Sequence, residues 1–275
     1  MVAGAEMTTT VKHAKQSGLP ADDGSSSHVR PSDWYADHTI EGAPSDDGWV
    51  TATETWTYAS ADDPTYTFTI SGDYTSKYQA GMKIKWTQTS VRYAIITKVA
   101  FASGTTTVTL YGGTDYDLDN AAISSPYYST ARSPFGFPMD PAKWTVSVAY
   151  GGGGQSSAVV DTYYNKSSIT IPIGVWDFWA RYYHGADGTT GAQCQLQSGI
   201  STANNSLSDV ALLAYLTAYI FTNTAQITET VFLRKQLNLS AKATYYLNIV
   251  SRQNAGTTRI FIGDGCLLEA VCAYL

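Results

Sequence analysis

Apolar and polar residues alternate along most of the chain, and this pattern predicts strands. Within Pro64–Ser71, Tyr66, Phe68 and Ile70 share one face while threonines occupy the other, as in a half-buried strand. Similar runs follow at 83–86, 92–99 and 105–111, and glycine-containing turns separate them. We therefore expect residues 46–150 to form a first β domain, either a small barrel or a sandwich.

Residues 158–275 show the same alternation and predict a second β domain. After Gly174, the apolar phase changes to a new set, which predicts a bulge or a bend between sheets: Trp176, Phe178, Ala180 and Tyr182. About eight short strands in this length are typical of a jelly roll or related sandwich. The apolar run Val210–Phe221 fits helical spacing as well, but its tyrosines and threonines favour a strand. The predicted fold class is all-β.

Two polar segments lie outside this pattern. Residues 1–45 are rich in Gly, Ser, Asp and Thr and lack apolar periodicity. Alone, such a segment cannot offset the entropy lost on ordering, so we expect an extended attachment arm that lies across a neighbouring subunit. Four consecutive glycines, Gly151–Gly154, precede Gln155 and two serines. This composition predicts a flexible linker at 151–157 between the two β domains.

Charge and hydropathy indicate which of three partners the chain suits: other protein chains, nucleic acid or a membrane. Charged residues make up 15% of the chain, below the ~25% of typical soluble domains, so we expect much surface to be buried against other chains. The net charge of −6 falls wholly within residues 1–150, and no cluster of Lys and Arg suggests nucleic-acid binding. The longest apolar run, Val210–Phe221, is shorter than the ~20 residues that span a bilayer, and residues 1–10 lack the apolar core of a signal peptide.

Residue types that carry catalysis or bind metals do not form a familiar pattern. Three cysteines without close spacing, Cys194, Cys266 and Cys272, predict neither a disulfide framework nor a zinc site. The aspartates of Thr114–Asn120 lack the glycine and glutamate of a calcium loop, and paired aspartates elsewhere fit turns. No Ser/His/Asp set or GxSxG elbow is visible. The sequence therefore predicts a non-enzymatic protein with no metal and no cofactor.

The aromatic stretch Trp176–His184 has the clearest binding chemistry. Asp177, Trp179, Arg181 and Tyr183 occupy the phase opposite to the apolar set. Aromatic and arginine side chains dominate the centres of protein interfaces, which favours a subunit contact. The alternative is a sugar-binding surface, because aromatic faces stack on sugar rings and polar groups bind hydroxyls. Its candidate ligand-binding residues are Trp179, Arg181, Tyr183 and His184.

One short motif in the arm resembles a known family. The segment HVRPSDWYADHTI, residues 28–40, resembles the PSDWNADH element near the N-termini of tailed-phage fibre and other virion proteins. Tyr35 replaces the usual Asn, and seven residues match: Pro31, Ser32, Asp33, Trp34, Ala36, Asp37 and His38. Residues Trp56–Gly113 look like a β domain common in the same proteins, and Pro134–Pro138 fits its end. The second domain is similar to the tumour-necrosis-factor-like or lectin-like jelly rolls that terminate phage fibres.

The resemblance implies a virion protein assembled in the host cytoplasm, usually a homotrimer, without shared catalytic residues. Asp33, Trp34 and His38 are then candidates for docking onto other virion proteins, because a Trp in a polar arm needs a pocket to leave water. We expect part of a fibre or spike, with a host cell-surface glycan as a candidate ligand. The alternatives are a capsid decoration or head-fibre protein without a receptor role, a polysaccharide-degrading spike and a stand-alone lectin. No long repeat supports a depolymerase, and a lectin would not need the arm.

Overall fold

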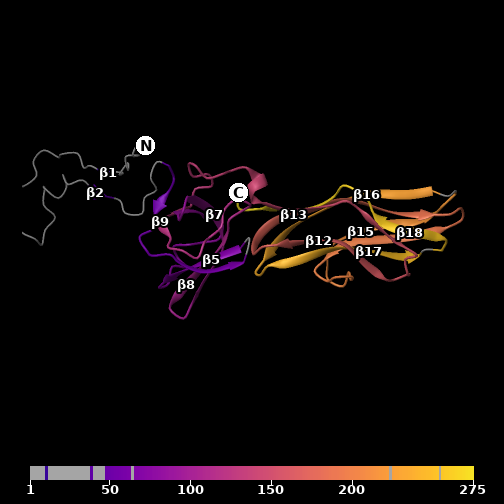
Figure 1. Ribbon diagram of the computed structural model, residues 1–275, viewed down its shortest axis with the longest axis horizontal. Helices are drawn as coiled ribbons and strands as arrows, with labels where there is room; N and C mark the ends of the chain where they lie inside the picture. The colour runs from indigo at the N-terminus through magenta and orange to yellow at the C-terminus, as the bar shows by residue number, and fades with distance from the viewer. Residues whose placement is uncertain (1–9, 12–37, 40–46, 63–64, 223–224, 254) are drawn as a thin grey trace, which may run out of the picture.

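The computed structural model describes residues 10–11, 38–39, 47–62, 65–222, 225–253 and 255–275. In these ranges the chain is almost entirely antiparallel β-structure, with one short 3-10 helix, η1 (Pro141–Trp144). This confirms the predicted all-β class. The molecule is elongated: β1 (Thr10–Val11) and β2 (His38–Thr39), which pair with each other, lie toward one end, β16 and β18 lie toward the other, and the C-terminus lies near the middle (Figure 1).

The first region is a single seven-stranded sheet in the order β3-β9-β6-β7-β8-β5-β4. Its buried aromatic and aliphatic residues form one core on one face, including Trp56, Phe68, Tyr78, Ile84 and Trp86. The predicted alternation of Tyr66, Phe68 and Ile70 is confirmed, since all three are buried. The strands are β3 (Val50–Thr51), β4 (Thr57–Asp62), β5 (Thr65–Ser71), β6 (Lys83–Thr87), β7 (Val91–Ala102), β8 (Thr105–Tyr111) and β9 (Ser124–Ser129).

The second region is a sandwich of two sheets. The first, the β13 sheet, has the order β10-β19-β13-β18-β11, and β16 pairs along the other edge of β13. The second, the β17 sheet, has the order β12-β17-β14-β15. Their strands are β10 (Thr145–Tyr150), β11 (Gly153–Ser156), β12 (Tyr163–Ile171), β13 (Gly174–Gly188), β14 (Gln193–Ser201), β15 (Val210–Ile220), β16 (Ala225–Leu239), β17 (Ala243–Gln253), β18 (Thr257–Ile262) and β19 (Cys266–Cys272).

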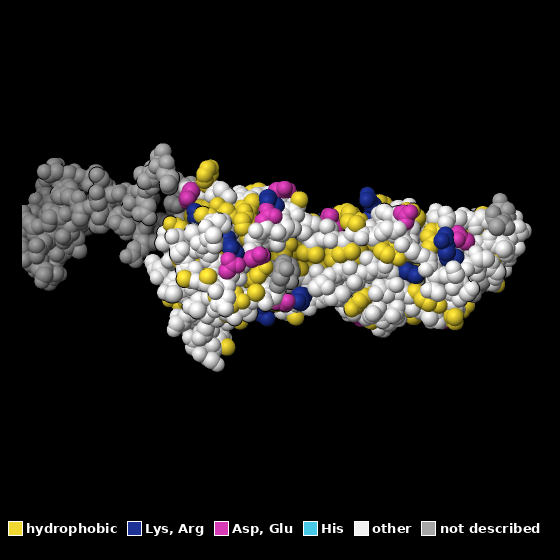
Figure 2. All heavy atoms as spheres, viewed as in Figure 1, with side chains coloured by type: hydrophobic (Ala, Val, Ile, Leu, Met, Phe, Trp, Pro, Cys, Tyr) yellow, Lys and Arg dark blue, Asp and Glu magenta, His cyan; other side chains and the backbone are white. Residues whose placement is uncertain are grey.

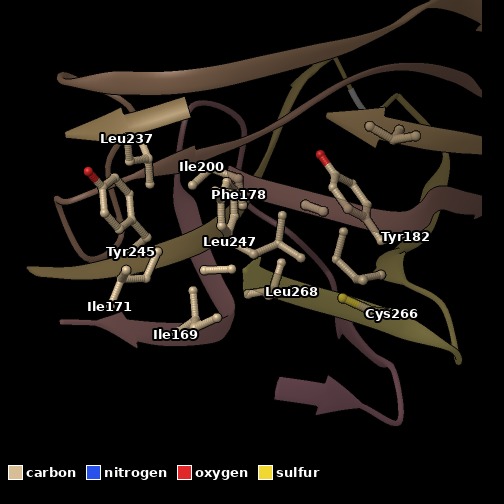
Figure 3. Packing of buried hydrophobic residues seen from close by; sticks show 14 of the residues in the cluster. Ile169, Ile171, Phe178, Tyr182, Ile200, Leu237, Tyr245, Leu247, Cys266 and Leu268 are labelled. Atoms are coloured by element: carbon tan, nitrogen blue, oxygen red, sulfur yellow. The ribbon is translucent and has the colours of Figure 1, made fainter. Parts of the chain in front are cut away.

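The interior of the sandwich is mostly aliphatic. Inward-facing side chains from both sheets meet there, as Figure 3 shows for Phe178 and Leu268 on the β13 sheet and Ile169 and Leu247 on the β17 sheet. The phase change predicted at Gly174 is present, because Trp176, Phe178, Ala180 and Tyr182 are all buried. Val210–Ile220 is a strand, which confirms the favoured interpretation of that apolar run.

The glycine run does not have the structure expected of a linker. Gly153–Ser156 is strand β11, which pairs with β18, and the preceding strand β10 already belongs to the sandwich through β19. The glycines fit here because side chains approach their backbone closely. A Cβ on Gly153 would lie 2.1 Å from the Tyr150 hydroxyl, and one on Gly154 would lie 2.6 Å from the side chain of Arg259. The run therefore reflects close packing and not chain flexibility.

The two regions share one continuous core. Tyr111 of the first region packs edge-on against Trp176 of β13, with ring centroids 4.9 Å apart. Phe137 and Trp144 stack at 5.0 Å beside them, and both belong to the same buried cluster as the sandwich interior. At the C-terminus, the Leu275 carbonyl accepts a hydrogen bond of 3.0 Å from Arg132 Nε. This aromatic joint, defined by Tyr111, Phe137, Trp144 and Trp176, makes the molecule one elongated unit.

Candidate functional site

The outer face of the β13 sheet carries the side chains that the sequence singled out. Trp179 and Tyr183 are partly exposed on β13, and Arg181 is exposed between them. The strand register places Phe232 of β16 opposite Arg181, and Arg234 opposite Trp179. Successive outward positions of neighbouring strands therefore form one aromatic and charged surface, as the alternation predicted.

A shallow groove follows this surface between β13, β16 and β19. Its outward-facing lining is Asp177, Trp179, Phe232, Arg234 and Val271. Phe232 is 70% exposed there. Figure 2 shows apolar side chains in a band along the long axis of the visible face. The groove combines flat aromatic faces with a carboxylate and a guanidinium, which suits either a sugar or a second protein surface.

Tyr183 is held in place more firmly than Trp179. Its ring covers Gly263, where a Cβ would lie 1.6 Å from Tyr183 Cε2, so only glycine leaves room for the ring. The Gly263 amide also donates a hydrogen bond of 2.8 Å to the Tyr183 carbonyl. Tyr183 thus supports the turn that connects β18 and β19, while Trp179 lies in the groove itself.

His184 does not lie with the other three candidate residues. Its side chain is fully buried on the inner face of β13, because an even-numbered position there shares the phase of Trp176 and Tyr182. His184 Nδ1 lies 2.8 Å from Ser198 Oγ of the β17 sheet, and Nε2 lies 3.4 Å from Glu229 Oε2 of β16. The prediction that His184 contributes to a surface ligand site is therefore corrected.

Burial governs the charge of this histidine. Desolvation lowers the pKa of His184 below its usual 6.5, while the hydrogen bond and the charge of Glu229 oppose that shift. The ring is consequently neutral near pH 7. The Tyr182 hydroxyl lies 2.9 Å from the same Ser198 oxygen, so one serine connects two side chains of the opposite sheet. This buried chain of hydrogen bonds ties the two sheets together.

The order Ser198–His184–Glu229 has the connectivity of a hydrolase triad, but the position of the serine does not suit catalysis. Ser198 is 0% exposed between the two sheets, so a substrate carbonyl has no route to its hydroxyl. No local sequence signal predicts these hydrogen bonds, because they join residues 14 and 45 positions apart. We assign these residues to the architecture of the sandwich.

Other reactive groups are also occupied or buried. Burial raises the pKa of the Cys194, Cys266 and Cys272 thiols to about 11, which leaves them protonated and unreactive. In the segment Thr114–Asn120, Asp119 forms an ion pair of 2.5 Å with Arg92, and Asp117 accepts a hydrogen bond from the Tyr66 hydroxyl. Within the described ranges, no group of three or more His, Cys, Asp or Glu side chains could hold a metal ion. No helix in the described part of the chain is long and apolar enough to cross a membrane.

The candidate docking residues of the arm are only partly within the described ranges. His38 belongs to β2, where its backbone pairs with Val11. Asp33 and Trp34 lie outside the described residues. Docking through this motif therefore stays a prediction.

Comparisons with known proteins give no family for this chain. No protein-family model matches the sequence, and no curated protein matches it. A structure of infectious bursal disease virus, Gt strain, aligns with 75% of this chain and 42% of its own chain, at 8% identity and a TM-score of 0.32. The Gx strain aligns with 96% of this chain and 69% of its own, at 11% identity and a TM-score of 0.31. Dimeric latent PorU from Porphyromonas gingivalis aligns with 81% of this chain and 24% of its own, at 9% identity and a TM-score of 0.25.

The chain thus spans less than half the length of the first and third of these structures.

Proposed function

We propose that this chain is a non-enzymatic structural protein of a tailed-phage particle, part of a fibre or spike. The observation that carries the proposal is the elongated arrangement of the two regions, in which the sandwich with its aromatic outer face lies beyond the seven-stranded sheet (Figure 1). The PSDWYADH motif precedes both regions in the sequence. An elongated, rigid β protein of this kind attaches at one end and presents a surface at the other.

Two further features support a structural role. The aromatic joint connects both regions through a common core. The sandwich is therefore held in a fixed orientation relative to the seven-stranded sheet, as a rigid part of a fibre or spike would require. Ser198 and His184, the two members of the triad-like set that are fully buried, lie inside the sandwich, where their hydrogen bond joins the two sheets.

The attachment arm is tested by removing it. We expect a variant that lacks residues 1–45 to keep its β circular-dichroism spectrum, since both cores are built from later residues, but to be missing from purified particles. A finer variant is Trp34→Ala, for which we expect the same loss. Its matched control is Tyr35→Asn, which restores the residue usual in the motif and should assemble normally. Normal incorporation of the truncated protein would refute docking by the arm.

Glycan binding is the finer part of the proposal and depends on Trp179, Arg181 and Tyr183. We expect Trp179→Ala to weaken binding to host cells at least about tenfold, because stacking on an aromatic ring contributes much of the affinity of such a site. Phe101→Ala is the matched control, since Phe101 is also exposed but lies in the first region. If binding is unchanged while the oligomer mass falls, the face is a subunit contact instead. If both are unchanged, the face has neither role.

Two measurements test the predicted homotrimer and the position of the protein on the particle. Native mass gives the number of chains, and an electron-microscopy map of the particle distinguishes a tail fibre from a head decoration. A capsid decoration protein without a receptor role would be present on particles whose adsorption to host cells does not depend on Trp179.

A further inference from the structure

One buried lysine has no acidic partner. Lys83 of β6 is only 2% exposed, and its ammonium group donates hydrogen bonds to the carbonyls of Gly81, at 3.2 Å, and Tyr274. Among the residues that the structure describes, Lys83 forms no ion pair. Desolvation lowers the pKa of Lys83 from its usual value, which reflects the cost of burying its charge. Loss of either carbonyl would therefore leave a buried cation poorly solvated.

The two carbonyls that Lys83 binds come from different regions of the molecule. Gly81 precedes β6 of the first region, whereas Tyr274 follows β19 of the sandwich. The next carbonyl along the chain, that of Leu275, accepts the hydrogen bond of 3.0 Å from Arg132, which follows β9 of the first region. Two cations of the first region thus hold the backbone that leaves the last strand of the sandwich.

Residues 273–275, here named the strap, also pack against the aromatic joint. The side chains of Tyr274 and Leu275 are partly buried against the core that the two regions share. The Lys83 ammonium lies 5.9 Å from the centroid of the Phe137 ring, which belongs to the joint. The lysine and the strap therefore meet at the place where the aromatic rings connect the two regions.

The boundary between the two regions is only partly filled by side chains. After η1, every strand of the described chain belongs to the sandwich, so the strands pass from one region to the other once. A cleft of about 450 Å³ lies at the boundary beside the strap. Gln79 and Val99 line it from the first region, and Leu239 and Tyr274 line it from the sandwich. The strap thus returns to the first region where packing between the regions is incomplete.

We propose that the strap is a conformational device with two states. Closed on Lys83, it fixes the sandwich relative to the seven-stranded sheet. Released, it lets the sandwich turn about residues 130–144, which connect the two regions. Segments held by few hydrogen bonds open locally at low free energy while the cores stay folded. Lys83 is then a positioning residue, and its burial without a counter-ion is explained by the carbonyl that the strap supplies.

Amide hydrogen exchange on the full chain tests the role of Lys83. The Ala273 amide donates a hydrogen bond of 3.0 Å to a carbonyl of β13 and reports on the strap. In Lys83→Met we expect this amide to exchange at least about tenfold faster, because the strap loses its donor. Lys85→Met is the matched control, since Lys85 lies on the same strand but pairs with Asp47. An unchanged Ala273 rate, or an equal acceleration throughout Trp176–Arg181, would overturn the proposal.

The orientation of the sandwich is measured between spin labels on two introduced cysteines. Ala102 in the first region and Thr190 in the sandwich are exposed, and the native cysteines are buried and do not compete. We expect the double variant Lys83→Met/Arg132→Gln to broaden the distribution of distances at least about twofold, as for a released hinge. Lys242→Ala, which removes a surface pair between the regions, should leave the width unchanged. An equally narrow distribution in the double variant would mean that the aromatic joint alone fixes the orientation, and the strap would have no such role.

Discussion

The centre of the seven-stranded sheet is covered on both faces, whereas the central strand of the β13 sheet is covered on one. In β7, Ala94 and Ile96 face the core of the first region while Ile95 faces the core shared with the sandwich, and all three are fully buried. In β13 from Gly174 to His184, every second residue is buried and the alternate ones reach the surface. The outer face of β13 is therefore open to solvent, whereas the middle of β7 is enclosed between two cores.

The largest expected effect comes from opening the joint between the two regions. Trp176 is fully buried against Tyr111, so we expect Trp176→Ala to lower the free energy of unfolding by about 3–5 kcal/mol, as for other buried aromatic residues. Trp179→Ala, three positions along the same strand on the outer face, should cost less than ~1 kcal/mol. Chemical denaturation measures both. Equal losses would mean that the two faces of β13 do not differ as described.

A smaller effect is expected where β16 and β18 approach the β13 backbone. A Cβ on Gly185 would lie 2.2 Å from the Ile227 carbonyl oxygen and 2.5 Å from the Phe261 ring, so backbone and ring must both move. We expect Gly185→Ala to destabilise the protein by about 1–3 kcal/mol, the usual cost of overpacking. Gly151→Ala is the control, because a Cβ there meets nothing within 4 Å. A harmless Gly185→Ala would show that β16 is not packed as tightly as its register implies.

The polar chain inside the sandwich predicts sensitivity to acid. Because burial lowers the pKa of His184 below 6.5, the unfolded chain binds this proton more readily than the folded one. The resulting stability is fully present above pH 6.5 and is lost as the pH falls toward the lowered pKa, by at most ~1.4 kcal/mol per pH unit for one proton. Denaturation at pH 7.5 and pH 5 measures the loss. His184→Gln should reduce this pH dependence, and an unchanged dependence would exclude His184 as its source.

The sequence predicted these regions well where neighbouring residues decide the structure. Alternation identified both the buried set from Trp176 to Tyr182 and the outward position of Trp179. It failed where distant residues decide. The glycines of β11 form a strand because they pair with β18, about 100 residues away, and His184 faces Ser198 of the other sheet. The place of β16 in its sheet depends on the order of strands, which periodicity along one strand does not determine.

The smallest change in the free energy of unfolding is expected from a surface ion pair between the two regions. Its size relative to that of Trp176→Ala tells whether the buried aromatic joint or surface charge holds the regions together. Lys242 Nζ lies 2.6 Å from Asp62 Oδ1, one contact between the sandwich and the first region outside the aromatic joint. Both side chains are largely exposed, so solvent screens the pair and ordering the lysine offsets much of the attraction. We expect Lys242→Ala to change the free energy of unfolding by about 0.5 kcal/mol or less, with little dependence on salt. A loss close to that of Trp176→Ala would mean that surface charge, and not the buried aromatic joint, fixes the sandwich to the first region.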